Sequence, residues 1–442
     1  MCRELYPAGN FASKQAAAML RTTAIALFLL GSCLECGSAA AEKIRKYETR
    51  RLTLYSDVAP ATAAMLLKAF DDAWRAWVAD FGPPPGDSPA TPFRITGCLM
   101  VDLEGFSDAG LLPEQIERFL QGTHPGKHRG SRFWMKDQRG DYYRRHLMIH
   151  EATHCFMTSR GGPVLPVWYL EGTAELYATH VFDKSTGRWR FAAMPVDVAA
   201  MPGWGRLGML RRDVRRGRLP RFDALAGLWK SEHEKIETYA WSWAFVRFLA
   251  SHPTLGKSFR ELGQHLGDGR FAATFERVFR PEFESLQFEW QLTARDLVPG
   301  FDFRRAAIRF RRSQPLPAKG SSTAVVADRG WQSTGLRLQK GRSFRVVATG
   351  RFTLAEKPRP WVSTADGISF RYHAGLPLGR LVGVVQPKRV TADRPPKIHS
   401  LGSRAEFVPE TDGTLFLRLN DFFSELADNT GTVAVEVVPV GP

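Results

Sequence analysis

The sequence predicts an α+β protein, with a mostly helical domain that contains a small sheet followed by an antiparallel β-sandwich. Three observations support this prediction. The 442 residues are 44% hydrophobic and 24% charged, as in globular chains, and they are enough for two or three domains. Helical apolar spacing dominates up to about residue 300. Short β-rich runs between Gly, Pro, Asn and Asp follow it.

The N-terminus has the pattern of an export signal. Basic residues precede an uncharged apolar run over 22–34, which is too short to span a membrane, and three alanines end at Ala41. We expect a signal peptide over 1–41 and a secreted or periplasmic bacterial protein. The alternative is a lipoprotein anchored at Cys33, because the residues before it resemble a lipobox. No later stretch approaches the length of a transmembrane span, so none is expected in the mature chain.

A first domain is expected over 42–310, with strands and helices mixed. Residues 51–55 alternate as a strand does, and 93–101 are typical of a buried strand. The spacing predicts a helix over 61–81, with Pro60 in its first turn and a Gly- and Pro-rich stop after it. Further helices are expected around 142–158, 170–181, 236–251 and 257–277.

A linker and a second domain complete the chain. The Pro, Gly and Ser content of 311–322 is that of a linker. The second domain, 323–442, is expected to be the antiparallel sandwich, because its turn residues recur at the spacing of such folds. Its predicted strands are 335–339, 343–349, 380–386, 404–408, 414–419 and 432–438.

The distribution of charge indicates which classes of partner to expect, and the cysteine content limits the possible disulfides. The net charge is +16, but it is spread along the chain and not gathered in a tail, so no nucleic-acid partner is expected. Seven arginines between 206 and 221 form either a solvated helix face or a surface for an anionic substrate or envelope polymer. After cleavage only Cys98 and Cys155 remain, as one disulfide or as two buried thiols.

His150-Glu151-Ala152-Thr153-His154 is the most informative motif in the chain. Residues four apart share one face of a helix, so the imidazoles of His150 and His154 can reach a single zinc ion. Glu151 lies beside that face, where a carboxylate can take a proton from a metal-bound water. The motif therefore predicts a catalytic zinc site with Glu151 as general base.

A third zinc ligand is expected from Glu171. It follows His154 by 17 positions, which is enough for one helix to end and a second to return antiparallel. Here the sequence resembles the gluzincin metallopeptidases, whose third ligand is a Glu within a Trp-x-x-Glu-Gly-x-Ala pattern. Trp168, Glu171, Gly172 and Ala174 reproduce that pattern. The resemblance implies a zincin-like fold and peptide-bond hydrolysis.

The same resemblance implies functions for two further residues, Glu175 and Tyr239. Glu175, one turn after Glu171, would hydrogen-bond a ligand histidine and fix its tautomer. Tyr239 would stabilise the oxyanion that forms as water attacks the carbonyl, although a packing role beside its aromatic neighbours is the alternative. His146 is expected to line the cleft and not to bind the metal.

The end of the second domain contains a candidate calcium loop. Asp421, Asp428 and Asn429 offer three side-chain oxygens on one loop, which suits a hard cation such as Ca²⁺. This part resembles the calcium-dependent galactose-binding bacterial lectins in the spacing of its final loop. The resemblance implies calcium ligation by these three residues, with backbone carbonyls near Leu354 and Glu425. The sugar-contacting residues of those lectins are absent from 363–367, and turn formation alone is the alternative.

The sequence thus predicts an exported zinc metallopeptidase that acts on a peptide or protein substrate, with an appended lectin-like module. The alternative is a carbohydrate-binding or adhesin-like envelope protein whose metallopeptidase domain is idle. The presence of Glu151 favours the enzyme, because a scaffold has no need of the base.

Overall fold

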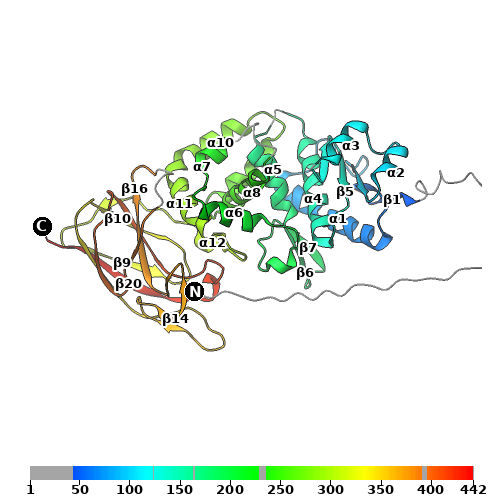
Figure 1. Ribbon diagram of the computed structural model, residues 1–442. Helices are drawn as coiled ribbons and strands as arrows, with labels where there is room; N and C mark the ends of the chain where they lie inside the picture. The colour runs from blue at the N-terminus through cyan, green and yellow to red at the C-terminus, as the bar shows by residue number, and fades with distance from the viewer. Residues whose placement is uncertain (1–42, 123, 163–164, 228–234, 391–395, 442) are drawn as a thin grey trace, which may run out of the picture.

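The computed structural model describes residues 43–441, except 123, 163–164, 228–234 and 391–395, and it is a mixed α+β structure. The predicted signal peptide and Cys33 lie outside the described residues. Among the described helices, none combines the length and the apolar character that crossing a bilayer requires. Figure 1 shows a β-rich region at one end, a helical region in the middle and a small sheet with its own helices at the other end.

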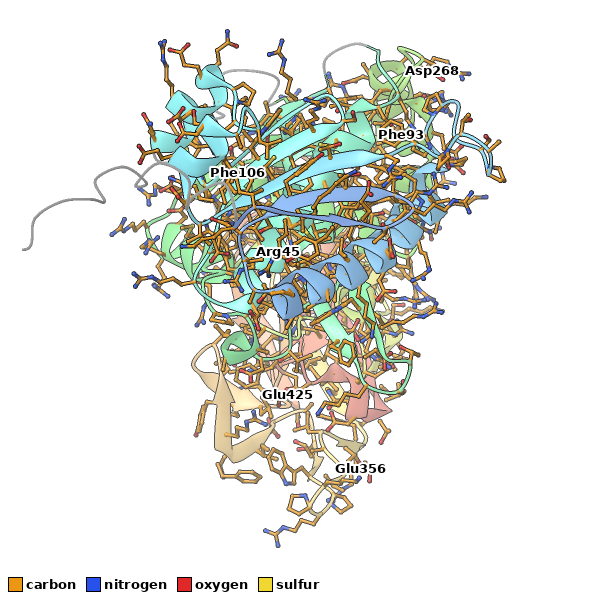
Figure 2. The ribbon with its side chains drawn as sticks, turned by 90° about the vertical axis from the view of Figure 1, so that its right-hand side faces the viewer. Arg45, Phe93, Phe106, Asp268, Glu356 and Glu425 are labelled. Atoms are coloured by element: carbon orange, nitrogen blue, oxygen red, sulfur yellow. The ribbon has the colours of Figure 1, made fainter. Side chains whose placement is uncertain are left out.

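The N-terminal sheet has five strands in the order β1-β2-β3-β5-β4. Strand β3 pairs in parallel with both β2 and β5, and the two outer pairs are antiparallel. Strand β4 therefore lies at an edge of the sheet. The strands are β1 (Arg45–Glu48), β2 (Leu52–Ser56), β3 (Ile95–Met100), β4 (Gly126–Arg129) and β5 (Arg132–Lys136). Figure 2 views this end and labels Arg45 on β1, with Glu356 and Glu425 in the β-rich region beneath.

Helices pack on this sheet and fill the middle of the molecule. They are α1 (Pro60–Phe81), α2 (Leu103–Asp108), α3 (Glu114–Gln121), α4 (Asp141–Thr158), α5 (Val167–Ala178), α6 (Arg206–Arg215), α7 (Phe222–Ala226), α8 (Ile236–Ser251), α9 (Gly256–Leu262), α10 (Phe271–Phe279), α11 (Phe283–Arg295) and α12 (Phe303–Ala306). A hairpin of β6 (His180–Asp183) and β7 (Arg188–Phe191) packs beside α1.

Most of the predicted elements of this region are confirmed, with two corrections. Helix α1 begins at Pro60 and ends before Gly82, whose φ of 74° favours glycine. The helix predicted over 257–277 is two helices, because glycines interrupt the segment between α9 and α10. The helix predicted to reach residue 181 ends at Ala178, and its last residues belong to the β6–β7 hairpin.

The C-terminal region contains two larger sheets that share one buried apolar cluster. One sheet has the order β17-β16-β19-β10-β8, and the other is built on β20, which pairs with β9, β11 and β12. The main strands are β9 (Ser321–Val326), β10 (Gln332–Leu338), β11 (Phe344–Thr349), β16 (Leu381–Pro387), β18 (Arg404–Phe407), β19 (Gly413–Leu419) and β20 (Thr430–Pro439). The shorter ones are β8 (Gln314–Pro315), β12 (Phe352–Thr353), β13 (Val362–Ser363), β14 (Ile368–His373), β15 (Leu376–Leu378) and β17 (Ile398–Ser400).

The predicted strands of the C-terminal region are present, but the predicted linker is partly structured. Strand β8 and the start of β9 fall within 311–322 and pair with β10 and β20. Apolar packing also continues across this segment. Phe416 of β19 contacts Phe288 of α11 and Phe310, with ring centroids 5.1 and 5.6 Å apart. The helical and β-rich regions therefore share a buried interface, and α11 and α12 lie beside it (Figure 1).

Candidate metal centre

Helix α4 carries the His-Glu-x-x-His motif through the middle of the helical region. Its residues from Leu147 to Met157 are all buried, which agrees with a core helix that is surrounded by other elements. Phe156, at its far end, packs edge-on against Trp74 of α1 at a ring-centroid distance of 5.1 Å. These contacts fix the rotation of α4, so the motif faces α5 and α8.

Helix α5 brings Glu171 to the motif because it packs closely against α8. Gly172 makes this approach possible: a Cβ there would lie 2.5 Å from the carbonyl oxygen of Ser242 and 2.6 Å from Cγ2 of Val246. Such distances are shorter than van der Waals contact, so no larger side chain fits without separating the helices. The Glu171-Gly172 pair thus combines a candidate ligand with the small residue that allows α5 to approach α8.

The donor atoms of His150, His154 and Glu171 form a compact triangle. The Nε2 atoms of the two histidines are 3.1 Å apart, and Oε2 of Glu171 lies 3.4 Å from His150 Nε2 and 3.2 Å from His154 Nε2. Adjacent ligands of a tetrahedral zinc lie about 3.3–3.4 Å apart, given metal–ligand distances of about 2.0–2.1 Å. All three side chains are buried. The residues present therefore fit a zinc ion.

Glu151 lies beside this triangle and lines a pocket of about 230 Å³. Its Oε2 is 3.5 Å from Nδ1 of His128 on β4, and the ring of His128 stacks on that of His154 at 4.3 Å. Burial raises the pKa of Glu151, but the neighbouring His128, His150 and His154 outweigh burial and lower it. Glu151 is therefore a carboxylate that can accept a proton. The sequence contains no motif that points to His128.

Glu175 also faces the site, and most of its hydrogen bonding is with Arg206. Nη2 of Arg206 donates to its Oε1 at 2.7 Å, and Nε donates to its Oε2 at 3.3 Å. The same carboxylate lies 3.3 Å from Nε2 of His146 and 3.6 Å from Nδ1 of His150. Burial raises the pKa of Glu175, but Arg206 and His146 lower it well below its usual range.

The two histidines of the motif have different acid–base environments. Burial lowers the pKa of His154 to about 4, so its imidazole is neutral near pH 7. Burial also lowers the pKa of His150, but the hydrogen bond with Glu171 and the charge of Glu175 outweigh it and raise the pKa to about 9. A cation that binds at the triangle would displace the proton of His150, as metal binding does at histidine sites.

Tyr239 of α8 borders the same pocket, which His146 also lines. Its ring centroid lies 6.3 Å from that of His150. Burial and the nearby carboxylates, Glu171 first among them, raise the pKa of Tyr239, so its phenol is protonated at neutral pH. A protonated phenol at this position can donate a hydrogen bond into the pocket.

The loop after β19 brings Asp421 and Asn429 together. Nδ2 of Asn429 donates to Oδ2 of Asp421 at 2.7 Å and to the carbonyl of Ala327 at 3.2 Å. Oδ1 of Asn429 is buried and has no hydrogen-bond partner among the described residues. Asp428 is exposed, and no contact joins its side chain to the other two within the described part of the loop. Its place in a calcium site stays a prediction.

The arginine-rich segment and the cysteines differ in part from their sequence-based interpretations. Arg206 is not part of a solvated face, because it is buried against Glu175, whereas Arg211 and Arg215 on the same helix are exposed. The sequence left open one disulfide or two buried thiols. In the structure, Cys98 and Cys155 are two free, buried thiols. Only the three-dimensional contact distinguishes Arg206 from its six arginine neighbours.

Comparisons with known proteins give two kinds of similar structure. No protein-family model and no curated protein matches the chain. A solved PllA-like lectin, the EclA N-terminal domain, is 20% identical over 27% of this chain and 95% of that chain, with a TM-score of 0.21. Two IMPa metallopeptidase structures also match. The one in complex with T-antigen is 11% identical over 64% of this chain, with a TM-score of 0.17.

The other, from Pseudomonas aeruginosa in complex with an O-glycopeptide, is 13% identical over 61% of this chain, with a TM-score of 0.16. This chain spans about a quarter of each metallopeptidase structure, since 27% of each is covered. The structures to which the chain is similar thus include a metallopeptidase and a lectin.

Proposed function

We propose that the chain is an exported zinc-dependent peptidase, with its catalytic domain over 42–310. One observation carries this proposal: the donor atoms of His150, His154 and Glu171 are spaced as the ligands of a tetrahedral zinc ion, beside the carboxylate of Glu151. All four side chains are buried, and His150 and Glu151 line the pocket of about 230 Å³. A structural zinc site would have four protein ligands and no such pocket.

Zinc held by these three residues would polarise a scissile carbonyl and lower the pKa of a water molecule. Glu151 accepts the proton of the attacking water and passes it to the leaving amine. Tyr239 donates a hydrogen bond to the carbonyl oxygen as negative charge develops on it. Arg206 and His146 hold Glu175, which lies close enough to His150 to orient its ring.

The test is hydrolysis of a diverse peptide library by the purified full chain, with and without a zinc chelator. We expect cleavage that the chelator abolishes and that added zinc restores. Glu151→Gln should bind zinc as the wild type does and lose hydrolysis, because an amide cannot accept the proton. Undiminished cleavage by that variant would overturn the mechanism. No cleavage by any form would favour the alternative, an envelope protein with an idle metallopeptidase domain.

We further propose that 323–442 is a lectin-like sandwich, joined by a linker at 311–322, whose last loop binds calcium. The buried Oδ1 of Asn429, without a hydrogen-bond partner among the described residues, supports this beside the Asp421 carboxylate. Galactose itself should bind weakly or not at all. Asp366, in the loop that contacts sugar in such lectins, accepts a hydrogen bond from the backbone of Ser403 at 2.9 Å. Glycan binding is tested on an array, with calcium or EDTA.

A further inference from the structure

A second cavity, of about 660 Å³, lies where the helical and β-rich regions meet. The end of α8, helix α9 and the segment 300–304 form most of its wall, and Ser424 and Ala427 contribute from the loop after β19. Its volume is within the range of about 300–1,000 Å³ that is typical of small-molecule sites. None of the residues proposed to hold zinc or to catalyse lines it.

The lining of this cavity is strongly basic. Arg247, Lys257, Arg260 and Arg304 face it, and Asp302 is the one acidic residue among the described lining residues. Asp302 is already engaged, because its Oδ2 accepts from Nη1 of Arg305 at 2.8 Å and its Oδ1 accepts two backbone N–H groups. Lys257 has only a distant partner, Glu261, at 4.0 Å. The positive charge of the cavity is therefore largely uncompensated.

Arg247 differs from the other basic residues of the cavity, because it is not an exposed surface side chain. Its Nη1 donates to the carbonyl of Ala192, and its guanidinium lies 5.6 Å from the ring centroid of Phe303. Its Nε is buried without a hydrogen-bond partner, and no carboxylate of the described residues lies within 4.0 Å of the guanidinium. Burial lowers the pKa of Arg247 to about 10, and no acidic group offsets that effect. Arg247 is half-buried, and a partly desolvated guanidinium without a carboxylate partner favours the binding of an anion.

A smaller cavity of about 260 Å³ adjoins the first, since Arg247 and Arg260 line both. Thr173 of α5 also lines this smaller cavity. Thr173 follows the zinc ligand Glu171 by two residues, which places it about 200° around the helix, on the opposite face. The carboxylate in this cavity, Asp80, accepts a hydrogen bond from the hydroxyl of Tyr177. The smaller cavity thus lies across α5 from the proposed metal centre.

We propose that the cavity lined by Arg247, Arg260 and Arg304 binds a small polyanion with two or more phosphate or sulfate groups. Arginine recognises such oxyanions through paired hydrogen bonds, and these three guanidiniums have no carboxylate partner among the described residues. An oxyanion in the cavity would offset the charge of the Arg247 guanidinium, which lines both cavities. Arg260 and Arg304, which are exposed on two different segments, would hold a second group. This proposal does not depend on the proposed peptidase activity.

The experiment is isothermal titration of the full chain with inorganic tripolyphosphate and, separately, with a disulfated heparin disaccharide. The double variant Arg260→Gln/Arg304→Gln removes two exposed side chains, so it should fold as the wild type does. Its matched control is Arg211→Gln/Arg215→Gln, which removes two exposed arginines of α6 outside the cavity. Any chelation of zinc by tripolyphosphate is the same in all three proteins and cancels in the comparison.

We expect saturable 1:1 binding that weakens about tenfold or more in the cavity variant and changes by less than about twofold in the control. The probe that binds more tightly distinguishes a phosphate from a sulfate ligand. Arg247→Gln should reduce binding as well. Binding that the control pair weakens equally would show attraction to general surface charge and overturn the proposal. No saturable binding of either probe at millimolar concentration would also overturn it.

Discussion

Arg206 holds Glu175 by two hydrogen bonds, from Nη2 to Oε1 at 2.7 Å and from Nε to Oε2 at 3.3 Å, and both side chains are buried. The two residues are 31 positions apart, on α6 and α5. A bidentate arginine fixes the orientation of a carboxylate as well as its charge. Glu175 is thereby held beside both His146 and His150. We therefore expect the arginine to influence the proposed zinc site through this carboxylate.

Replacing Arg206 tests this relationship. Arg206→Gln leaves Glu175 buried without its main counter-charge, which should cost about 3–5 kcal/mol of stability. Zinc affinity should fall about 10–100-fold, because the residues that orient a ligand histidine contribute to that extent. Zinc affinity is measured by competition with a chelator, and stability by urea unfolding. Arg211→Gln, an exposed change on the same helix, is the control and should alter neither. Wild-type zinc affinity in Arg206→Gln would show that Glu175 does not need its partner.

The proposed third zinc ligand, Glu171, has a separate test. Glu171→Ala removes one corner of the donor triangle, so we expect the variant to lose most of its zinc after dialysis, while the wild type keeps one ion per chain. Elemental analysis of both proteins provides the measurement. Glu237→Ala, an exposed change at the start of α8, is the control. Full occupancy in Glu171→Ala would remove this residue from the site.

Gly126 of β4 leaves space for Glu151, the proposed general base. A Cβ there would lie 2.5 Å from Oε1 of Glu151, so Gly126→Ala must displace that carboxylate. We expect zinc binding to persist and the rate of peptide cleavage to fall about 100-fold, since a displacement of about 1 Å can cost that much. Gly208→Ala on α6 is the matched control, because nothing lies within 4 Å of its added methyl group. Equal rates in both variants would place Glu151 away from the chemistry.

Local patterns explain which parts of this architecture could be predicted from the sequence. Helix α1 is bounded by Pro60 and Gly82, and α4 carries a motif whose four-residue spacing already implies one face. The strands of the C-terminal region lie between turn residues. Each of these signals lies within a few residues of the element that it marks.

Contacts between distant segments could not be predicted in the same way. The pairing of Arg206 with Glu175, and the stacking of His128 on His154, depend on how whole elements pack. The parallel pairing of β3 with β2 and β5 also joins segments that are distant in the sequence. The β4–β5 hairpin is local, but its strands have only four and five residues, too few for a clear alternating pattern. The interface between Phe288 and Phe416 joins two predicted domains, and hydrophobicity alone does not name the partner.

The close packing of α5 on α8 leads to a stability prediction. Gly172→Ala places a methyl group 2.5 Å from the carbonyl oxygen of Ser242, so the helices must separate, at a cost of about 1–3 kcal/mol. The separation also moves Glu171, so zinc affinity should fall together with stability. Urea unfolding and chelator competition measure the two effects, again with Gly208→Ala as the control. A Gly172→Ala protein as stable as the wild type would show that α5 and α8 can move apart freely.

We predict that the loop after β19 makes the stability of the chain depend on pH and on calcium. Burial raises the pKa of Asp421 to about 6, although the hydrogen bond from Asn429 partly opposes this. The folded chain therefore binds more protons than the unfolded chain between about pH 4 and pH 6, given an unfolded Asp pKa of about 3.9. The free energy of unfolding should fall as the pH rises through this window, by up to about 3 kcal/mol, and level off above it. Calcium should reverse the loss, because it binds the ionised carboxylate and only in the folded loop.

Urea unfolding from pH 4.5 to pH 7.5, in EDTA and in calcium, measures both effects. Asp421→Asn cannot ionise, so the difference between wild type and variant isolates this carboxylate from other groups such as Asp296, whose pKa burial also raises. In EDTA that difference should change with pH in the direction given above. In calcium it should shrink near pH 7, because only the wild type gains stability from the ion. A difference that is constant with pH in EDTA would mean that Asp421 ionises at an ordinary pKa. A calcium effect of equal size in the variant would show that the ion binds elsewhere. The polar residues of this loop would then serve only to form the turn.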